Sequence, residues 1–160
     1  MRILIDLQGA QCDSRFRGIG RYSLSLALAM ARNAGEHEIW LALSAAFPQS
    51  ILDLRHAFSD LIPQERIRVF SIPQPTAEVE PANGWRARAA EIIREEFLES
   101  IQPDVIHIPS LFEGYGDDAV ASLGVCTSGY KTAVTLHDLI PLLDQASYLP
   151  NPIIRDYYFR

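Results

Sequence analysis

The hydrophobic positions of the chain fall into short continuous runs, separated by longer stretches with helical spacing. The continuous runs predict buried strands over residues 2–7, 38–44, 66–72, 104–108 and 131–137. Apolar residues three and four positions apart predict helices over 21–34, 50–61, 85–101 and 117–123. Strands that alternate with helices imply right-handed crossovers between parallel neighbours. The pattern therefore predicts one α/β domain over residues 1–160, a Rossmann-like three-layer fold with a parallel sheet.

The helix expected over 85–101 shows the clearest division into an apolar and a charged face. Its apolar residues recur every four positions and should face the core: Ala89, Ile93, Phe97 and Ile101. Its charged residues should face solvent: Arg88, Glu91, Glu95 and Glu99.

The end of the sequence predicts a further helix. Asn151 followed by Pro152 is a typical start, because asparagine caps the first turn and proline fits the first helical position. The aromatic-rich segment 153–160 then ends without a C-capping signal. We expect either a fragment of a longer protein or a helix that packs on something beyond this chain.

Composition narrows the class of protein. The chain has 160 residues and a formal net charge of −6, which argues against a nucleic-acid partner. Its two cysteines, Cys12 and Cys126, form no C-x-x-C motif, as is typical of a reduced cytosolic protein. No apolar stretch approaches the roughly 20 residues of a membrane span. We therefore expect a cytoplasmic protein.

Ligands of open parallel sheets bind beyond the carboxyl ends of the strands, which points to the loops that follow them. The loop after the first strand carries Gly18 and Gly20 ahead of a helix, beside Arg21. Such a turn either serves the geometry of the chain or offers backbone N–H groups to a phosphate. It is not a dinucleotide-binding fingerprint, because Ser23 stands where the third glycine would be.

His137 and Asp138 lie at the carboxyl end of the last predicted strand. An imidazole there can bond a substrate hydroxyl or move a proton; the alternative is a structural histidine, with Asp138 capping the next turn. His107 lies inside strand 104–108, where a core histidine is favoured. These residues lack the spacing of metal ligands, and we expect no metal.

The loop after strand 104–108 combines Ser110, Phe112 and Tyr115 with glycines and carboxylates. Aromatic faces beside hydrogen-bonding groups suit a sugar or another polyol. The alternative is a plain surface turn.

Four segments taken together resemble a known family: residues 1–6 (MRILID), 17–22 (RGIGRY), 103–107 (PDVIH) and 135–141 (TLHDLIP). In this order and spacing they resemble the N-terminal half of glycosyltransferase family 4 enzymes, which have the two-domain GT-B fold. The resemblance extends to bacterial mannosyltransferases of surface-polysaccharide assembly.

The resemblance implies transfer of a sugar from a nucleotide-diphosphate sugar to a saccharide or lipid-linked acceptor, with retention at the anomeric carbon and no metal or other cofactor. It implies a C-terminal donor-binding domain as partner, and peripheral contact with the inner membrane face through a lipid-linked acceptor. The residues it assigns are Gly18, Gly20 and Arg21 at the donor diphosphate, His137 and Asp138 in catalysis, and His107, Ser110, Phe112 and Tyr115 at the acceptor.

Two alternatives stay open. One is a non-catalytic binding module of flavodoxin-like shape, and the other is a GT-B-like sugar-nucleotide epimerase. Because the donor-binding half is absent from these 160 residues, we expect the chain to fold but not to catalyse transfer by itself.

Overall fold

The computed structural model describes residues 1–125 and 129–159. The strands are β1 (Arg2–Asp6), β2 (Glu38–Ser44), β3 (Ile67–Phe70), β4 (Val105–Ile108) and β5 (Lys131–Val134). The α-helices are α1 (Gly18–Arg32), α2 (Pro48–Ala57), α3 (Gly84–Ser100), α4 (Ile140–Leu143), α5 (Gln145–Tyr148) and α6 (Pro152–Phe159). Short 3₁₀ turns are η1 (Gln8–Ala10), η2 (Asp13–Phe16), η3 (Gln64–Arg66) and η4 (Pro81–Asn83). Cys126 lies outside the described residues.

The five strands form one parallel sheet in the order β3-β2-β1-β4-β5. Leu4 of β1 pairs with Trp40 of β2 on one side and with Ile106 of β4 on the other. The predicted α/β fold with a parallel sheet is confirmed. The strand order reverses between β1 and β4, and this reversal is where ligands bind in sheets of this kind.

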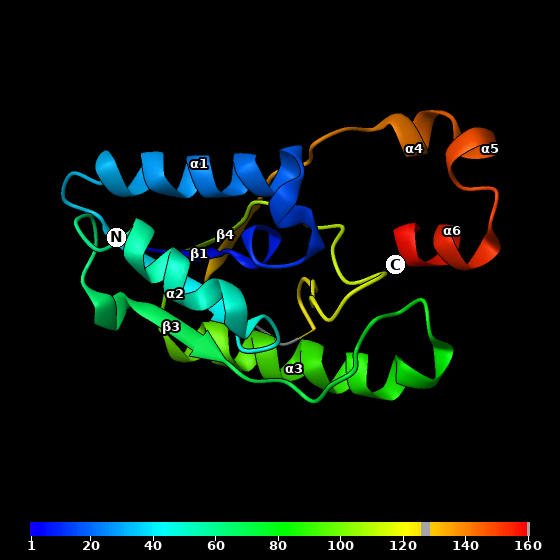
Figure 1. The fold of residues 1–160 in the computed structure, drawn as a ribbon, viewed down its shortest axis with the longest axis horizontal. Helices are drawn as coiled ribbons and strands as arrows, with labels where there is room; N and C mark the ends of the chain where they lie inside the picture. Colours follow the sequence, from blue (N-terminus) through cyan, green and yellow to red (C-terminus); the bar gives the residue numbers. More distant parts are fainter. Residues whose placement is uncertain (126–128, 160) are drawn as a thin grey trace.

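Helices cover both faces of the sheet, which explains why its strands read as continuous apolar runs (Figure 1). On one face, residues of α1 and α2 join the sheet in a core that includes Ile5, Leu41, Ala27, Ala31, Leu54 and Phe58. On the other face, α3 contributes to a core that includes Leu4, Ile106, Phe70, Leu98 and Ile101.

The face that α3 buries differs from the prediction. Ile93, expected in the core, is 42% exposed, whereas Glu91 and Glu95 are buried. Arg94 is fully buried and its guanidinium reaches Asp6 at the carboxyl end of β1, with Nε 2.7 Å from Oδ2. The helix therefore turns these charged residues inward, where Arg94 is paired with Asp6 of β1, Glu91 with Arg88 of the same helix, and Glu95 accepts a hydrogen bond from Ser122 Oγ.

The helix predicted over 117–123 does not form. Asp117 accepts a hydrogen bond from the backbone N–H of Ala119, and Asp118 accepts one from the N–H of Thr76. Farther along, Gln8 bonds both the N–H and the carbonyl of Val120. These side chains satisfy the backbone of the segment in an irregular path and compete with helix formation.

The segment from α4 to α6 lies beyond the carboxyl ends of the strands, at the end of the molecule drawn in orange and red in Figure 1. The start of α6 follows the prediction, since Asn151 Oδ1 accepts the N–H of Ile153 at 2.9 Å. In the part of the chain that the structure describes, no helix is long and apolar enough to cross a membrane.

Candidate functional site

The loops after β1 and β4 meet at the point where the strand order reverses. Glu113, in the loop after β4, is 8% exposed and faces η1 and η2. Its Oε2 accepts hydrogen bonds from Ser14 Oγ at 2.9 Å and from Cys12 Sγ at 3.3 Å. Its Oε1 accepts from Ser110 Oγ at 2.6 Å. The buried carboxylate thus ties the two loops together.

A pocket of about 320 Å³ opens beside this junction, between the loop after β4 and the α4–α6 segment. It brings together five residues that the sequence singled out: Ser110, Phe112, Tyr115, His137 and Asp138. Ile19, between the two glycines of the α1 turn, also lines it. Residues far apart in sequence therefore share one concave, mostly apolar surface that includes a few polar groups, the general form of a small-molecule site.

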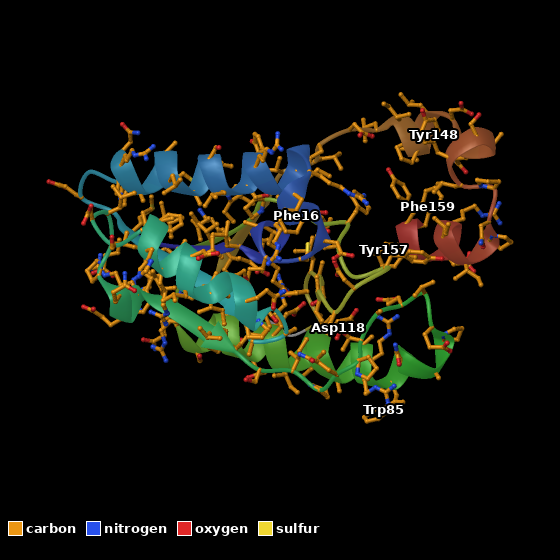
Figure 2. All side chains as sticks on the ribbon, viewed as in Figure 1. Phe16, Trp85, Asp118, Tyr148, Tyr157 and Phe159 are labelled. Carbon is orange, nitrogen blue, oxygen red and sulfur yellow. The ribbon has the colours of Figure 1, made fainter. Side chains whose placement is uncertain are left out.

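Helices α5 and α6 supply most of the remaining wall, which the sequence analysis did not identify. Phe112 stacks on Tyr158 with ring centroids 4.7 Å apart, and Tyr115 lies against Tyr157 at 5.4 Å. Figure 2 shows Tyr148 and Tyr157 on the helices at this end of the molecule. The only signal in the sequence was the concentration of aromatic residues near its end.

His137 lies in the loop after β5 with its ring edge-on to Tyr22, the centroids 5.1 Å apart. Its Nε2 is 2.9 Å from the carbonyl oxygen of Pro109. A carbonyl can only accept, so Nε2 must carry the proton and donate it. In the neutral ring Nδ1 is then an acceptor. The structure thus orients an imidazole in the pocket wall with one defined acceptor atom.

Asp138 is exposed and accepts the N–H of Ile140 at 3.0 Å, so its carboxylate bonds the backbone of the first residue of α4. This is the structural alternative raised for Asp138, and it coexists with a place in the pocket wall.

His107 occupies a different position from the other candidates. It is half-buried in β4, and its Nε2 lies 3.1 Å from Thr135 Oγ1. Burial lowers the pKa of its imidazole, which favours the neutral ring. His107 is not among the described residues that line the pocket. Its surroundings favour the core-histidine interpretation.

The glycine turn is already helical, because α1 begins at Gly18, three residues earlier than predicted. Gly18 and Arg21 are exposed, and no side chain caps the first turn of α1. Gly20 is buried, and a Cβ there would overlap the backbone of Ser14 and Arg15. The two glycines therefore differ: close packing of η2 on α1 requires Gly20, and nothing in the described structure requires Gly18.

We expect Gly20→Ala to lower the free energy of unfolding by about 2–3 kcal/mol, because the added methyl group must displace backbone. Gly18→Ala is the matched control, since a Cβ at that position meets nothing within 4 Å, and it should leave stability unchanged or slightly raised. Urea unfolding followed by circular dichroism measures both. Equal stability of the two variants would contradict this assignment.

Cys12, Glu113 and Asp117 place possible metal-ligand atoms within 4.8 Å of one another. Both carboxylate groups already accept hydrogen bonds, Asp117 from the N–H groups of Asp13 and Ala119. Burial, and then the nearby charges of Glu113 and Asp117, raise the pKa of the Cys12 thiol, whereas a metal ligand would be a thiolate. We assign no ion to this cluster.

Comparison with known proteins places this geometry in context. No protein-family model matches the chain. The serotype-specific mannosyltransferase WbdA of Escherichia coli is 38% identical over 159 residues, which are 99% of this chain and 19% of that protein. The chain is similar to a mannosyltransferase over nearly its whole length. The resemblance to bacterial mannosyltransferases inferred from the motifs is confirmed.

Two further WbdA sequences of E. coli are 35% identical over 131 residues, which are 81% of this chain and 16% of each protein. The chain thus spans less than a fifth of the length of these mannosyltransferases. The segments that build the pocket, from α1 to α6, fall within the 159-residue similarity to the first of them.

Proposed function

We propose that the chain is the acceptor-binding side of a mannosyltransferase that moves a mannosyl group from a nucleotide-diphosphate sugar to a saccharide acceptor. The observation that carries the proposal is the pocket at the strand-order reversal, with its aromatic wall and the polar side chains of Ser110, His137 and Asp138. Similarity to mannosyltransferase WbdA along the chain supports the choice of reaction and sugar.

The wall of the pocket suits the chemistry of a sugar. Sugars present apolar C–H faces and peripheral hydroxyl groups. Tyr115, Tyr157 and Tyr158 offer aromatic surface for the first, while Ser110 and His137 offer polar atoms for the second. We propose that an acceptor sugar stacks on this wall and places its attacking hydroxyl near His137.

The exposed first turn of α1 borders the same pocket through Ile19. Its uncapped N–H groups, the helix dipole and the guanidinium groups of Arg17 and Arg21 favour a negative charge. We propose that Gly18, Gly20 and Arg21 face the donor diphosphate across a cleft whose other side is a C-terminal donor-binding domain of a longer protein. The packing role of Gly20 leaves Gly18 as the glycine at which a ligand can approach most closely.

In the proposed step, the oxygen of the acceptor hydroxyl forms a bond to the anomeric carbon, and the bond from that carbon to the diphosphate oxygen breaks. The hydroxyl proton passes to the departing diphosphate or to solvent, and the electron pair leaves with the nucleoside diphosphate. We propose retention at the anomeric carbon and no metal requirement, as the resemblance to glycosyltransferase family 4 implies. His137 would bond the acceptor or the transferred sugar through Nδ1.

We propose that the reaction contributes to surface-polysaccharide synthesis on the cytoplasmic side, where a lipid-linked acceptor would bring the enzyme to the inner membrane face. The support is the resemblance, together with the similarity to the E. coli mannosyltransferase WbdA, which is named as serotype-specific.

The test uses the full-length protein, GDP-mannose labelled in the sugar, and an α-mannosyl oligosaccharide acceptor, with and without EDTA. We expect the oligosaccharide to gain mannose in both conditions, with the new linkage keeping the donor's anomeric configuration. The 160-residue chain alone should give no product. Absence of transfer from GDP-mannose would exclude GDP-mannose as the donor, and absence of transfer by the full-length protein from every nucleoside-diphosphate mannose would refute the proposal. Epimerised nucleotide sugar as the product would favour the epimerase alternative.

A further inference from the structure

Glu113 is the buried carboxylate next to the pocket, and the function proposed above gives it no role. It does not touch the pocket itself, yet it holds a residue that does. We propose that Glu113 is a positioning residue that makes Ser110 a hydrogen-bond acceptor toward the ligand, so that the pocket selects a sugar hydroxyl able to donate. This inference rests on the proposed function of the pocket as a saccharide site.

The geometry fixes the direction of the hydrogen bond from Ser110. An ionised carboxylate can only accept, and Glu113 Oε1 lies 2.6 Å from Ser110 Oγ, a short charge-assisted distance. The hydroxyl has one proton, which this bond uses. Two lone pairs remain on Ser110 Oγ, and Ser110 lines the pocket. A ligand that meets this oxygen must therefore supply the proton.

The carboxylate cannot easily turn away from Ser110, because several segments hold it. Its other oxygen, Oε2, accepts from Ser14 and Cys12 in the loop after β1. Its backbone carbonyl accepts from the Tyr157 hydroxyl of α6 at 2.6 Å. The next residue, Gly114, has φ +100° and no room for a Cβ beside Ala119, so the turn is fixed as well. Glu113 is over-determined by its contacts, as a positioning residue must be.

His137 gives the pocket a second atom of the same polarity. Its Nε2–H is donated to Pro109, so in the neutral form of the ring Nδ1 is also an acceptor. A ligand with donating hydroxyl groups satisfies both Ser110 and His137. A ligand group that only accepts, such as an ether oxygen at the same place, leaves the buried oxygen of Ser110 unpaired and is disfavoured.

The experiment measures binding to the chain by NMR titration, so that it does not depend on transfer. The probes are methyl α-D-mannopyranoside and its 2-, 3-, 4- and 6-deoxy derivatives. In the wild-type chain we expect at least one deoxy derivative to bind about five- to tenfold more weakly than the parent sugar, as loss of one such hydrogen bond implies. Ser110→Ala should abolish that difference by weakening the parent to the same level.

Glu113→Gln should behave as Ser110→Ala does, because an amide can present N–H to Ser110 and free its proton toward the pocket. The double variant should be no weaker than Ser110→Ala, since Glu113 acts through Ser110. Ser14→Ala is the matched control: it removes another hydrogen bond to the same carboxylate and should keep the wild-type preference.

Three outcomes would overturn the inference: no saccharide binding by the wild-type chain, a wild-type preference retained in Glu113→Gln, or losses that add in the double variant. If Glu113→Gln fails to fold, the deoxy series on wild type and Ser110→Ala still decides whether Ser110 acts as an acceptor. If the full-length protein transfers mannose but Glu113→Gln keeps the wild-type preference among the deoxy sugars, this inference alone is wrong. If the chain binds saccharides but the full-length protein transfers none, the proposed reaction alone is wrong.

Discussion

Replacement of Arg94 by methionine is expected to lower the free energy of unfolding by about 3–5 kcal/mol, the cost of leaving one member of a buried ion pair without its partner. Arg94 is fully buried and Asp6 is 3% exposed, and Nη2 lies 2.5 Å from Oδ2. Arg94 Nη1 also donates to the carbonyl of Ser122 at 3.2 Å. Methionine keeps most of the length of the side chain and removes all of these interactions.

Urea unfolding of the purified chain measures the effect. Arg68→Met is the matched control, because Arg68 is exposed on β3, and it should change the unfolding free energy by less than about 0.5 kcal/mol. The double variant Asp6→Asn/Arg94→Met should have a free energy of unfolding about 1–2 kcal/mol higher than Arg94→Met alone. The asparagine removes the unpaired buried charge and still accepts a hydrogen bond from Gln8. Equal stability of Arg94→Met and Arg68→Met would show that the buried pair contributes nothing.

The pair of Asp6 and Arg94 also marks the limit of prediction from the sequence. The order and type of the main elements were readable, because buried parallel strands leave continuous apolar runs such as residues 38–44. The buried face of α3 was not readable. Helical periodicity places charged residues on the solvent side, and it cannot show that the carboxylate of Asp6, at the end of β1, pairs with Arg94.

The candidate site was partly predictable for a related reason. The rule that ligands bind beyond the carboxyl ends of parallel strands selected the loops that carry Ser110 and His137, and the structure brings these residues to one pocket. Tyr157 and Tyr158 were missed, since the position of α6 depends on contacts such as the Phe112 stack rather than on local pattern. Their functional roles stay predictions.

The Asp6–Arg94 pair and the pocket are linked through the chain. Gln8 bonds Asp6 and both backbone groups of Val120, so the ion pair helps to hold the segment that follows the Glu113 turn. A charged pair whose net stabilisation is modest can still fix the path of this irregular segment. The buried ion pair at the end of β1 and the path of the loop after β4 are therefore connected by hydrogen bonds at the strand-order reversal.

Replacement of His137 by alanine in the full-length protein is expected to reduce kcat for mannosyl transfer about 100-fold, the scale on which a positioned acid, base or hydrogen-bonding group acts. The fold should be little affected, because His137 is exposed. The circular dichroism spectrum and unfolding midpoint check the fold, and transfer from labelled donor measures kcat. Activity within threefold of wild type would refute a role for His137 in the reaction.

Two conservative variants distinguish the roles of the two ring nitrogens of His137. Glutamine can place an amide near Nε2 and keep the bond to Pro109, whereas asparagine can place its amide oxygen near Nδ1. If Nδ1 acts as a hydrogen-bond acceptor, His137→Asn should recover at least tenfold over His137→Ala, and His137→Gln should recover less. If the ring transfers a proton, neither amide can replace it and both variants should stay near the alanine level. Because Nε2 donates its proton to Pro109, either role would act through the lone pair of Nδ1, and the two variants distinguish between them.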